Sequence, residues 1–254
     1  MAYIAKISAV VLFLFGRFSK CDSQEYGVDV SFPTFRPVST NYEWLPHNKD
    51  PLNNPTPKEY EGMPVQTLGN RAQFYQEFLD GCRKHYGKKA RACDETEEGR
   101  LQMSLRQPQS MQNYTDTGFK KIRAPEAVRQ LLFDYWEKNK DKKSQEIWST
   151  GNTYTNHWAA PTYMTSVEDT KLRGGGSDMK QKIWDAAQET MEEWTGMELT
   201  PTSMYGIRVY TEGAVLAPHV DRLPLVSSAI VNVAQDVDED WPLEVIGRDG
   251  NAYN

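Results

Sequence analysis

The residues best suited to chemistry lie close together in the last fifth of the chain. One residue separates His219 from Asp221, in the segment Pro218-His219-Val220-Asp221. On a β-strand, residues i and i+2 project from the same face, so an imidazole nitrogen and a carboxylate oxygen at this spacing can reach one metal ion. They would be two of the three ligands in a two-histidine, one-carboxylate Fe(II) site. We predict that His219 and Asp221 are iron ligands, although the bare H-x-D pattern is also frequent by chance.

The residues around this pair strengthen the prediction. Tyr210 lies nine positions before His219, Gly213 lies six before it, and a β-rich run from Leu225 to Ala234 follows. With this pattern the chain resembles the 2-oxoglutarate- and Fe(II)-dependent dioxygenases of the prolyl 4-hydroxylase-like group. In that family a strand with a tyrosine leads through a glycine-containing loop to P-H-x-D. The resemblance covers about Tyr205 to Ile246 and is loose elsewhere.

The resemblance implies a fold, an activity and a site. The family fold is a double-stranded β-helix, or jelly roll, with helices against its larger sheet. The activity is hydroxylation of a peptidyl, chiefly prolyl, substrate, so the expected partner is a proline-rich polypeptide. Fe(II) is the implied cofactor and 2-oxoglutarate the cosubstrate, with ascorbate as a further cofactor. Tyr210 would donate a hydrogen bond to a 2-oxoglutarate carboxylate, and the strand Ser227–Val233 would line the site.

The chain departs from the family pattern after Asp221. The family uses a second histidine and then a lysine or arginine, but no histidine follows His219. The other histidines are His47, His85 and His157. His157 lies upstream of the family position, and Arg222 and Arg248 are poor stand-ins for the basic residue. We therefore expect a C-terminally truncated enzyme that binds iron weakly and does not turn over.

Helix and strand patterns around the site predict an α+β protein, with N-terminal helices packed on a partial double-stranded β-helix. Three helices are expected from apolar spacing and end signals: one over Phe74–Tyr86 with Asn70 as its cap and Gly87 as its stop, one from Pro125, and one capped by Ser177 and stopped by Gly196. Strands are expected at Ile147–Tyr154, Met204–Tyr210, Leu225–Ala234 and Leu243–Ile246. The charged residues between Arg83 and Glu98 are interpreted as a solvated surface.

The N-terminal residues are typical of an export signal. Lys6 precedes an apolar run from Ile7 to Phe15, which is too short for a membrane-spanning helix. The alternatives are a short buried strand or helix, or an uncleaved anchor. Export predicts the secretory pathway (the endoplasmic reticulum lumen or secretion), with no stable membrane insertion after cleavage. It also favours a disulfide between Cys82 and Cys93.

These patterns divide the chain into four parts. Residues 1–23 are the expected signal peptide, 24–68 an extended proline-rich linker, 69–145 a helical region and 146–254 the partial oxygenase domain. The 35 acidic and 29 basic residues give a net charge of −6, which argues against a general nucleic-acid binder. Two other functions stay open. One is a secreted, non-catalytic jelly-roll binding module, and the other is a cupin-like metal protein that uses Asp236 or Glu244.

Overall fold

The structure is a computed structural model that describes residues 7–16, 72–106, 119–221, 225–238, 243, 245–246 and 252–253. Several predictions fall outside these residues and are not addressed by it. They are the linker 24–68, the helix cap Asn70, and the roles considered for Arg222, Glu244 and Arg248.

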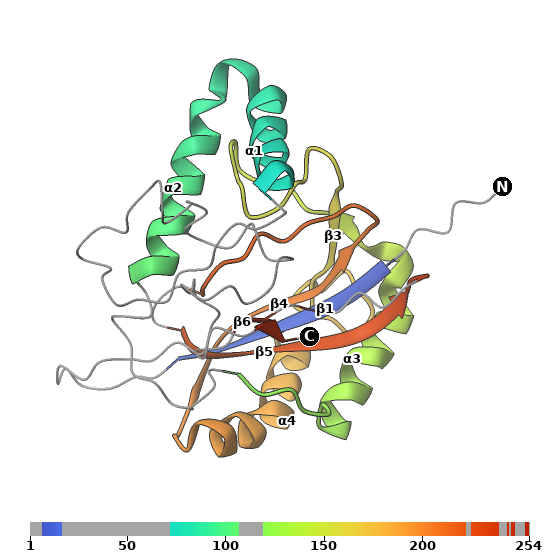
Figure 1. Ribbon diagram of the computed structural model, residues 1–254. Coiled ribbons are helices and arrows are strands. Elements are labelled where there is room, and N and C mark those ends of the chain that lie inside the picture. Colours follow the sequence, from blue (N-terminus) through green and yellow to red (C-terminus); the bar gives the residue numbers. More distant parts are fainter. Residues whose placement is uncertain are drawn as a thin grey trace.

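The described part of the chain is an α+β fold with four α-helices, which confirms the predicted class (Figure 1). The helices are α1 (Ala72–Tyr86), α2 (Arg91–Arg106), α3 (Glu126–Asn139) and α4 (Ser177–Thr195). The strands are β1 (Ile7–Gly16), β2 (Ser144–Gln145), β3 (Thr162–Thr165), β4 (Thr200–Tyr210), β5 (Leu225–Asp236), β6 (Val245–Ile246) and β7 (Ala252–Tyr253). The predicted helices and the strands ending at Tyr210 and starting at Leu225 are therefore present.

The main sheet is antiparallel and has the strand order β2-β3-β4-β1-β5. Strand β1 lies between β4 and β5 and pairs with both along its length. This strand is the apolar run that the sequence assigned to an export signal, so the structure contains the strand alternative. Export and cleavage stay predictions. Strands β6 and β7 form a separate antiparallel pair.

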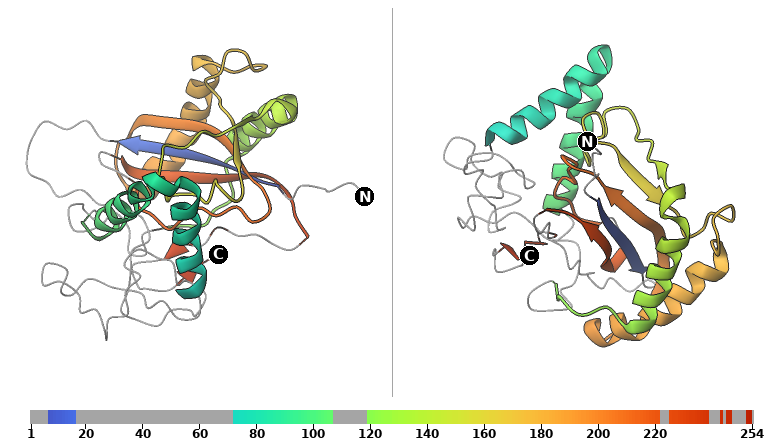
Figure 2. Two further views of the ribbon diagram at one scale, coloured as in Figure 1. Left: turned by 90° about the horizontal axis from the view of Figure 1, so that it is seen from above. Right: turned by 90° about the vertical axis from the view of Figure 1, so that its right-hand side faces the viewer.

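Helices α3 and α4 cover one face of the sheet, and the hairpin of α1 and α2 lies on the other side (Figure 2). The largest core lies under α3 and α4, because both helices place apolar residues at helical spacing toward alternate residues of the strands. Its buried members include Val128 and Leu132 of α3, Ile183, Ala187 and Met191 of α4, and Ile207 and Val209 of β4. Arg208 and Tyr210 lie on the opposite face of β4, away from this core.

Two local predictions were wrong. Residues 147–154 do not form a strand, because Gly151 adopts φ +76° and turns the chain where a Cβ would lie 2.3 Å from the backbone of Ala92. Ser177 does not cap α4 but is its first residue, and the cap position is Gly176. The charged residues predicted to form a solvated surface between Arg83 and Glu98 are exposed or half-exposed, except Glu97, which is buried on α2. Gly196 does end α4, in a left-handed conformation with φ +66°.

Candidate metal site

The H-x-D pair lies in the connection between β4 and β5. Residues 217–221 form a loop and not a strand, which corrects the predicted backbone. A neighbouring segment holds this loop. The amide of Ala217 donates to the carbonyl of Tyr154 at 2.8 Å, and Leu216 forms an isolated β-bridge with Thr155. The side chain of Asn156 accepts from the amide of Val215 at 2.8 Å and donates to the carbonyl of Gly213 at 2.8 Å.

His219 is half-buried, and one of its ring nitrogens is engaged by its own loop. Nδ1 lies 2.8 Å from the carbonyl oxygen of Ala217. A carbonyl can only accept, so Nδ1 carries the hydrogen and the lone pair of Nε2 is left for another partner. Metal-binding histidines have this arrangement, in which the second nitrogen donates to a carbonyl or carboxylate.

Asp221 and Tyr154 share the surroundings of His219. Burial lowers the pKa of His219, and the carboxylate of Asp221 opposes that effect. The ring of Tyr154 meets the ring of His219 edge-on, with 5.4 Å between centroids. Burial also raises the pKa of the Tyr154 phenol, and the charge of Asp221 acts in the same direction. The rings of Tyr154 and His219 are therefore in contact, and the charge of Asp221 acts on both of them.

Tyr210 lies at the end of β4, directly before this loop, and interacts with Arg208. Burial raises the pKa of Tyr210 above its ordinary value of 10.0, and the guanidinium of Arg208 opposes the shift. The phenol is thus protonated at neutral pH and able to donate a hydrogen bond. Arg208 is fixed by Glu146, to which Nε and Nη2 donate at 2.8 and 2.9 Å. The positive charge of Arg208 also lowers the pKa of His219.

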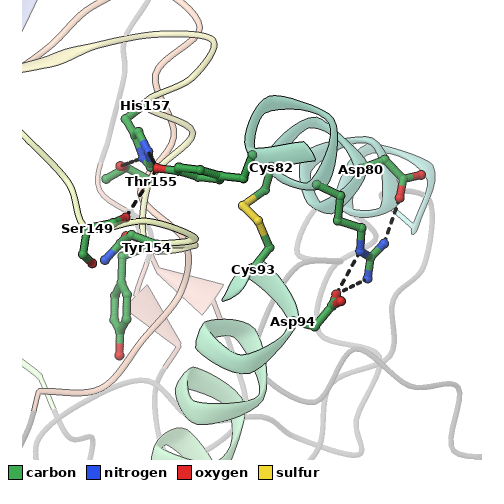
Figure 3. The surroundings of a disulfide bond; sticks show 11 residues. Asp80, Cys82, Cys93, Asp94, Ser149, Tyr154, Thr155 and His157 are labelled. Atoms are coloured by element: carbon green, nitrogen blue, oxygen red, sulfur yellow. Dashed lines mark hydrogen bonds and ion pairs between the residues drawn. A yellow bond between two sulfur atoms is a disulfide. The ribbon is translucent and has the colours of Figure 1, made fainter. Parts of the chain in front are cut away.

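His157 lies apart from the pair, in an aromatic cluster beside α1. Its Nε2 lies 2.7 Å from the hydroxyl of Tyr86, and its ring stacks on that of Trp148 with 6.2 Å between centroids. Figure 3 shows His157 and Thr155 directed from their loop toward the helical hairpin. The structure thus gives His157 a packing role, and the described contacts do not bring it to His219.

The donor set is incomplete within the described residues. There, no group of three or more histidine, cysteine, aspartate or glutamate side chains is placed to hold a metal ion. His219 and Asp221 supply one nitrogen and one oxygen donor of the types that suit Fe(II). The pair thus fits two positions of such a site and leaves the third protein ligand unassigned. Asp236, considered for a cupin-like site, lies at the far end of β5.

The hairpin of α1 and α2 packs onto the loop. A disulfide joins Cys82 of α1 to Cys93 of α2, as predicted, with 6.1 Å between the Cα atoms (Figure 3). Tyr75, Phe78 and Leu79 of α1 form a small core with Ala217, against which Trp158 packs. At Gly81 a Cβ would lie 2.6 Å from Nε1 of Trp158, so only a glycine lets the two segments come this close.

The hairpin also contains a buried polar network that was not predicted from the sequence. It consists of Tyr75, Glu97 and Arg100. The only signal was the i, i+3 spacing of Glu97 and Arg100, which is equally frequent on exposed helix faces.

No protein family model, curated protein or solved structure matches this chain. Among the described helices, none combines the length and apolar composition needed to cross a membrane.

Proposed function

We propose that the chain is part of a 2-oxoglutarate- and Fe(II)-dependent dioxygenase of the prolyl 4-hydroxylase-like group. In this proposal His219 and Asp221 hold the iron, and the antiparallel sheet with α3 and α4 on one face is part of a double-stranded β-helix. The second histidine of the family pattern has no counterpart after His219 in this sequence.

One observation carries the proposal more than any other. His219 donates Nδ1–H to the carbonyl of Ala217 at 2.8 Å. The lone pair of Nε2 is therefore available to bind a metal ion. The carboxylate of Asp221 is close enough to act on the pKa of the same imidazole. A neutral imidazole with a fixed tautomer beside a carboxylate is a suitable pair of ligands for a ferrous ion.

The surrounding residues would prepare the site for an oxo-acid. When bound, the iron and 2-oxoglutarate would supply the oxidising chemistry. Tyr210 would donate its phenolic hydrogen to a carboxylate of the oxo-acid, and Arg208 would keep that phenol in place. Tyr154, with its ring against His219, would cover one side of the imidazole and limit the access of water.

The proposed substrate and location follow from the family resemblance and from the N-terminal run. A proline-rich polypeptide in the secretory pathway would meet the site on the side of the α1–α2 hairpin. The disulfide between Cys82 and Cys93 agrees with an oxidising compartment.

An anaerobic titration with Fe(II), in the presence and absence of 2-oxoglutarate, tests the proposal. We expect weak, saturable binding by the 254-residue chain, because two protein ligands are in place. Binding should be at least about tenfold weaker in His219→Ala and in Asp221→Ala, as loss of a metal-site residue commonly produces. His85→Ala, which removes an exposed histidine of α1, is the matched control and should bind as the parent chain does.

Unchanged affinity in both ligand variants would exclude this pair from the site. Absence of saturable binding by the parent chain would favour the non-catalytic binding module.

A further inference from the structure

Two long charged side chains of α2 are almost completely buried. Arg100 is 1% exposed and Glu97 is 6% exposed. Nε of Arg100 donates to one carboxylate oxygen of Glu97 at 3.0 Å, and Nη2 donates to the other. The hydroxyl of Tyr75 on α1 donates to the same carboxylate. Charged groups are tolerated at this depth only when they are paired, so each member of the network depends on the others.

The third nitrogen of the Arg100 guanidinium reaches the candidate metal loop. Nη1 donates to the carbonyl oxygen of Pro218, the residue directly before His219 and 118 positions away along the chain. The carboxylate of Glu97 orients the guanidinium so that Nη1 faces this carbonyl. A lysine could not reproduce this contact, because only the planar guanidinium presents donors in a fixed fork.

We propose that Arg100 is a positioning residue that fixes His219 for metal binding. This inference rests on the proposed function. The contact adds to two others, in which the amide of Ala217 donates to Tyr154 and its carbonyl accepts from Nδ1 of His219. The amide of Ala217 and the carbonyls of Ala217 and Pro218 are thus all hydrogen-bonded, which restrains the backbone directly before the residue that carries the imidazole. The ring then keeps Nε2 directed away from the loop.

The disulfide and the helix packing hold Arg100 at the required depth. Cys82 and Cys93 join α1 to α2 at the end of the hairpin, and Tyr75 joins the helices again through Glu97. Because Phe78 and Leu79 pack on Ala217, the hairpin and the loop form one unit.

Amide hydrogen exchange measured by NMR tests this role without any metal. In Arg100→Met the amide of Ala217 should exchange about tenfold faster, since a hydrogen bond to a charged group is lost. The ring of His219 should change from a single Nδ1–H tautomer to a mixture, which its nitrogen chemical shifts report. Arg100→Lys should not restore the protection, because an ammonium group lacks the fixed fork of donors that joins Glu97 to the Pro218 carbonyl.

Two controls separate positioning from general stability. Arg83→Met removes an exposed arginine of the same hairpin that pairs with Asp80 and Asp94, and it should leave Ala217 unchanged. The double variant Glu97→Gln with Arg100→Met removes both buried charges, so its helices should remain folded while Ala217 still exchanges faster. Protection in α4, at Ile183 and Met191, should be kept in every variant.

The role is overturned if Ala217 and the His219 tautomer are unchanged in Arg100→Met, or if α4 loses protection to the same extent as the loop. A Mn²⁺ titration of the same variants separates this outcome from failure of the proposed function. If the parent chain shows no metal binding but the loop loosens, positioning stands and the metal proposal fails. If metal binds equally to parent chain and variant with an unchanged loop, positioning alone fails.

Discussion

At the scale of single residues, His219 combines a fixed tautomer with a nearby carboxylate. The Nδ1 hydrogen is held at 2.8 Å by the Ala217 carbonyl, so the direction of Nε2 is set before any ligand arrives. His157 differs from His219 in its hydrogen-bond partners, because its ring nitrogens face the hydroxyls of Tyr86 and Thr155. Two histidines of similar burial thus have different chemistry because their hydrogen-bond partners differ.

His157 makes stability depend on pH. Burial lowers its pKa below the ordinary value of 6.5, and the neighbouring His85 acts in the same direction. The unfolded chain therefore takes up a proton at this residue more readily than the folded chain does. The free energy of unfolding should fall as the pH decreases below about 6.5, which is the direction that linkage requires for a depressed histidine pKa.

The check is urea unfolding at several pH values for the parent chain and His157→Gln. The parent chain should lose more stability than the variant between about pH 7 and pH 5. His85→Gln removes only the smaller contribution to the lowered pKa of His157 and should keep most of the parent's pH dependence. Parallel pH profiles for parent and His157→Gln would contradict this explanation.

The spacing of His219 and Asp221 and the position of Tyr210 could be predicted from the sequence, because they are local. The buried network could not. Arg100 meets a carbonyl 118 residues away, and α2 carries the charged composition of an exposed helix. Burial of Glu97 and Arg100 is decided by the packing of α1 and of the loop, which no local pattern encodes.

At the scale of elements, the sequence predicted α3, α4 and β4. Apolar residues recur at helical spacing in the two helices and alternate with polar residues in the strand. The short strands β2 and β3 were not predicted, because they contain few residues. Strand β3 pairs with β4, and β2 pairs with β3 at the edge of the described sheet. The composition of the run Ile7–Phe15 suits both an export signal and a strand. The structure pairs it with β4 and β5, and export stays a prediction.

Strand β1 yields a prediction about the whole sheet. It is the only link between β4 and β5 in the described sheet, so its removal breaks two ladders at once. A chain lacking residues 1–16 should lose most of its free energy of unfolding, which for a domain is about 5–15 kcal/mol. A chain lacking residues 1–5, which precede β1, is the control.

Circular dichroism with urea unfolding measures both chains. An unchanged unfolding midpoint after removal of residues 1–16 would show that β1 does not belong to the sheet, and it would favour cleavage of the run as an export signal. Loss of folding in that chain, with the control unaffected, would mean that an exported, cleaved protein needs another strand between β4 and β5.

At the scale of the whole molecule, one face of the sheet carries the main core and the other carries the candidate site. The large core under α3 and α4 stabilises one face. The other face carries Arg208 and Tyr210, the loop with His219 and Asp221, and the disulfide-linked hairpin that holds this loop. On this side of the sheet lie the buried ion pair of Glu97 with Arg100 and the half-buried pair of Glu146 with Arg208.

The most direct test of the account asks where a metal ion sits. Mn²⁺, a paramagnetic substitute for Fe(II), broadens the NMR signals of nearby side chains. Added in small amounts, it should broaden the ring signals of His219 before those of the exposed His85, and Asp221→Asn should abolish that preference. Equal broadening of the two histidines, or a preference for His219 that survives Asp221→Asn, would contradict a metal site made by His219 and Asp221.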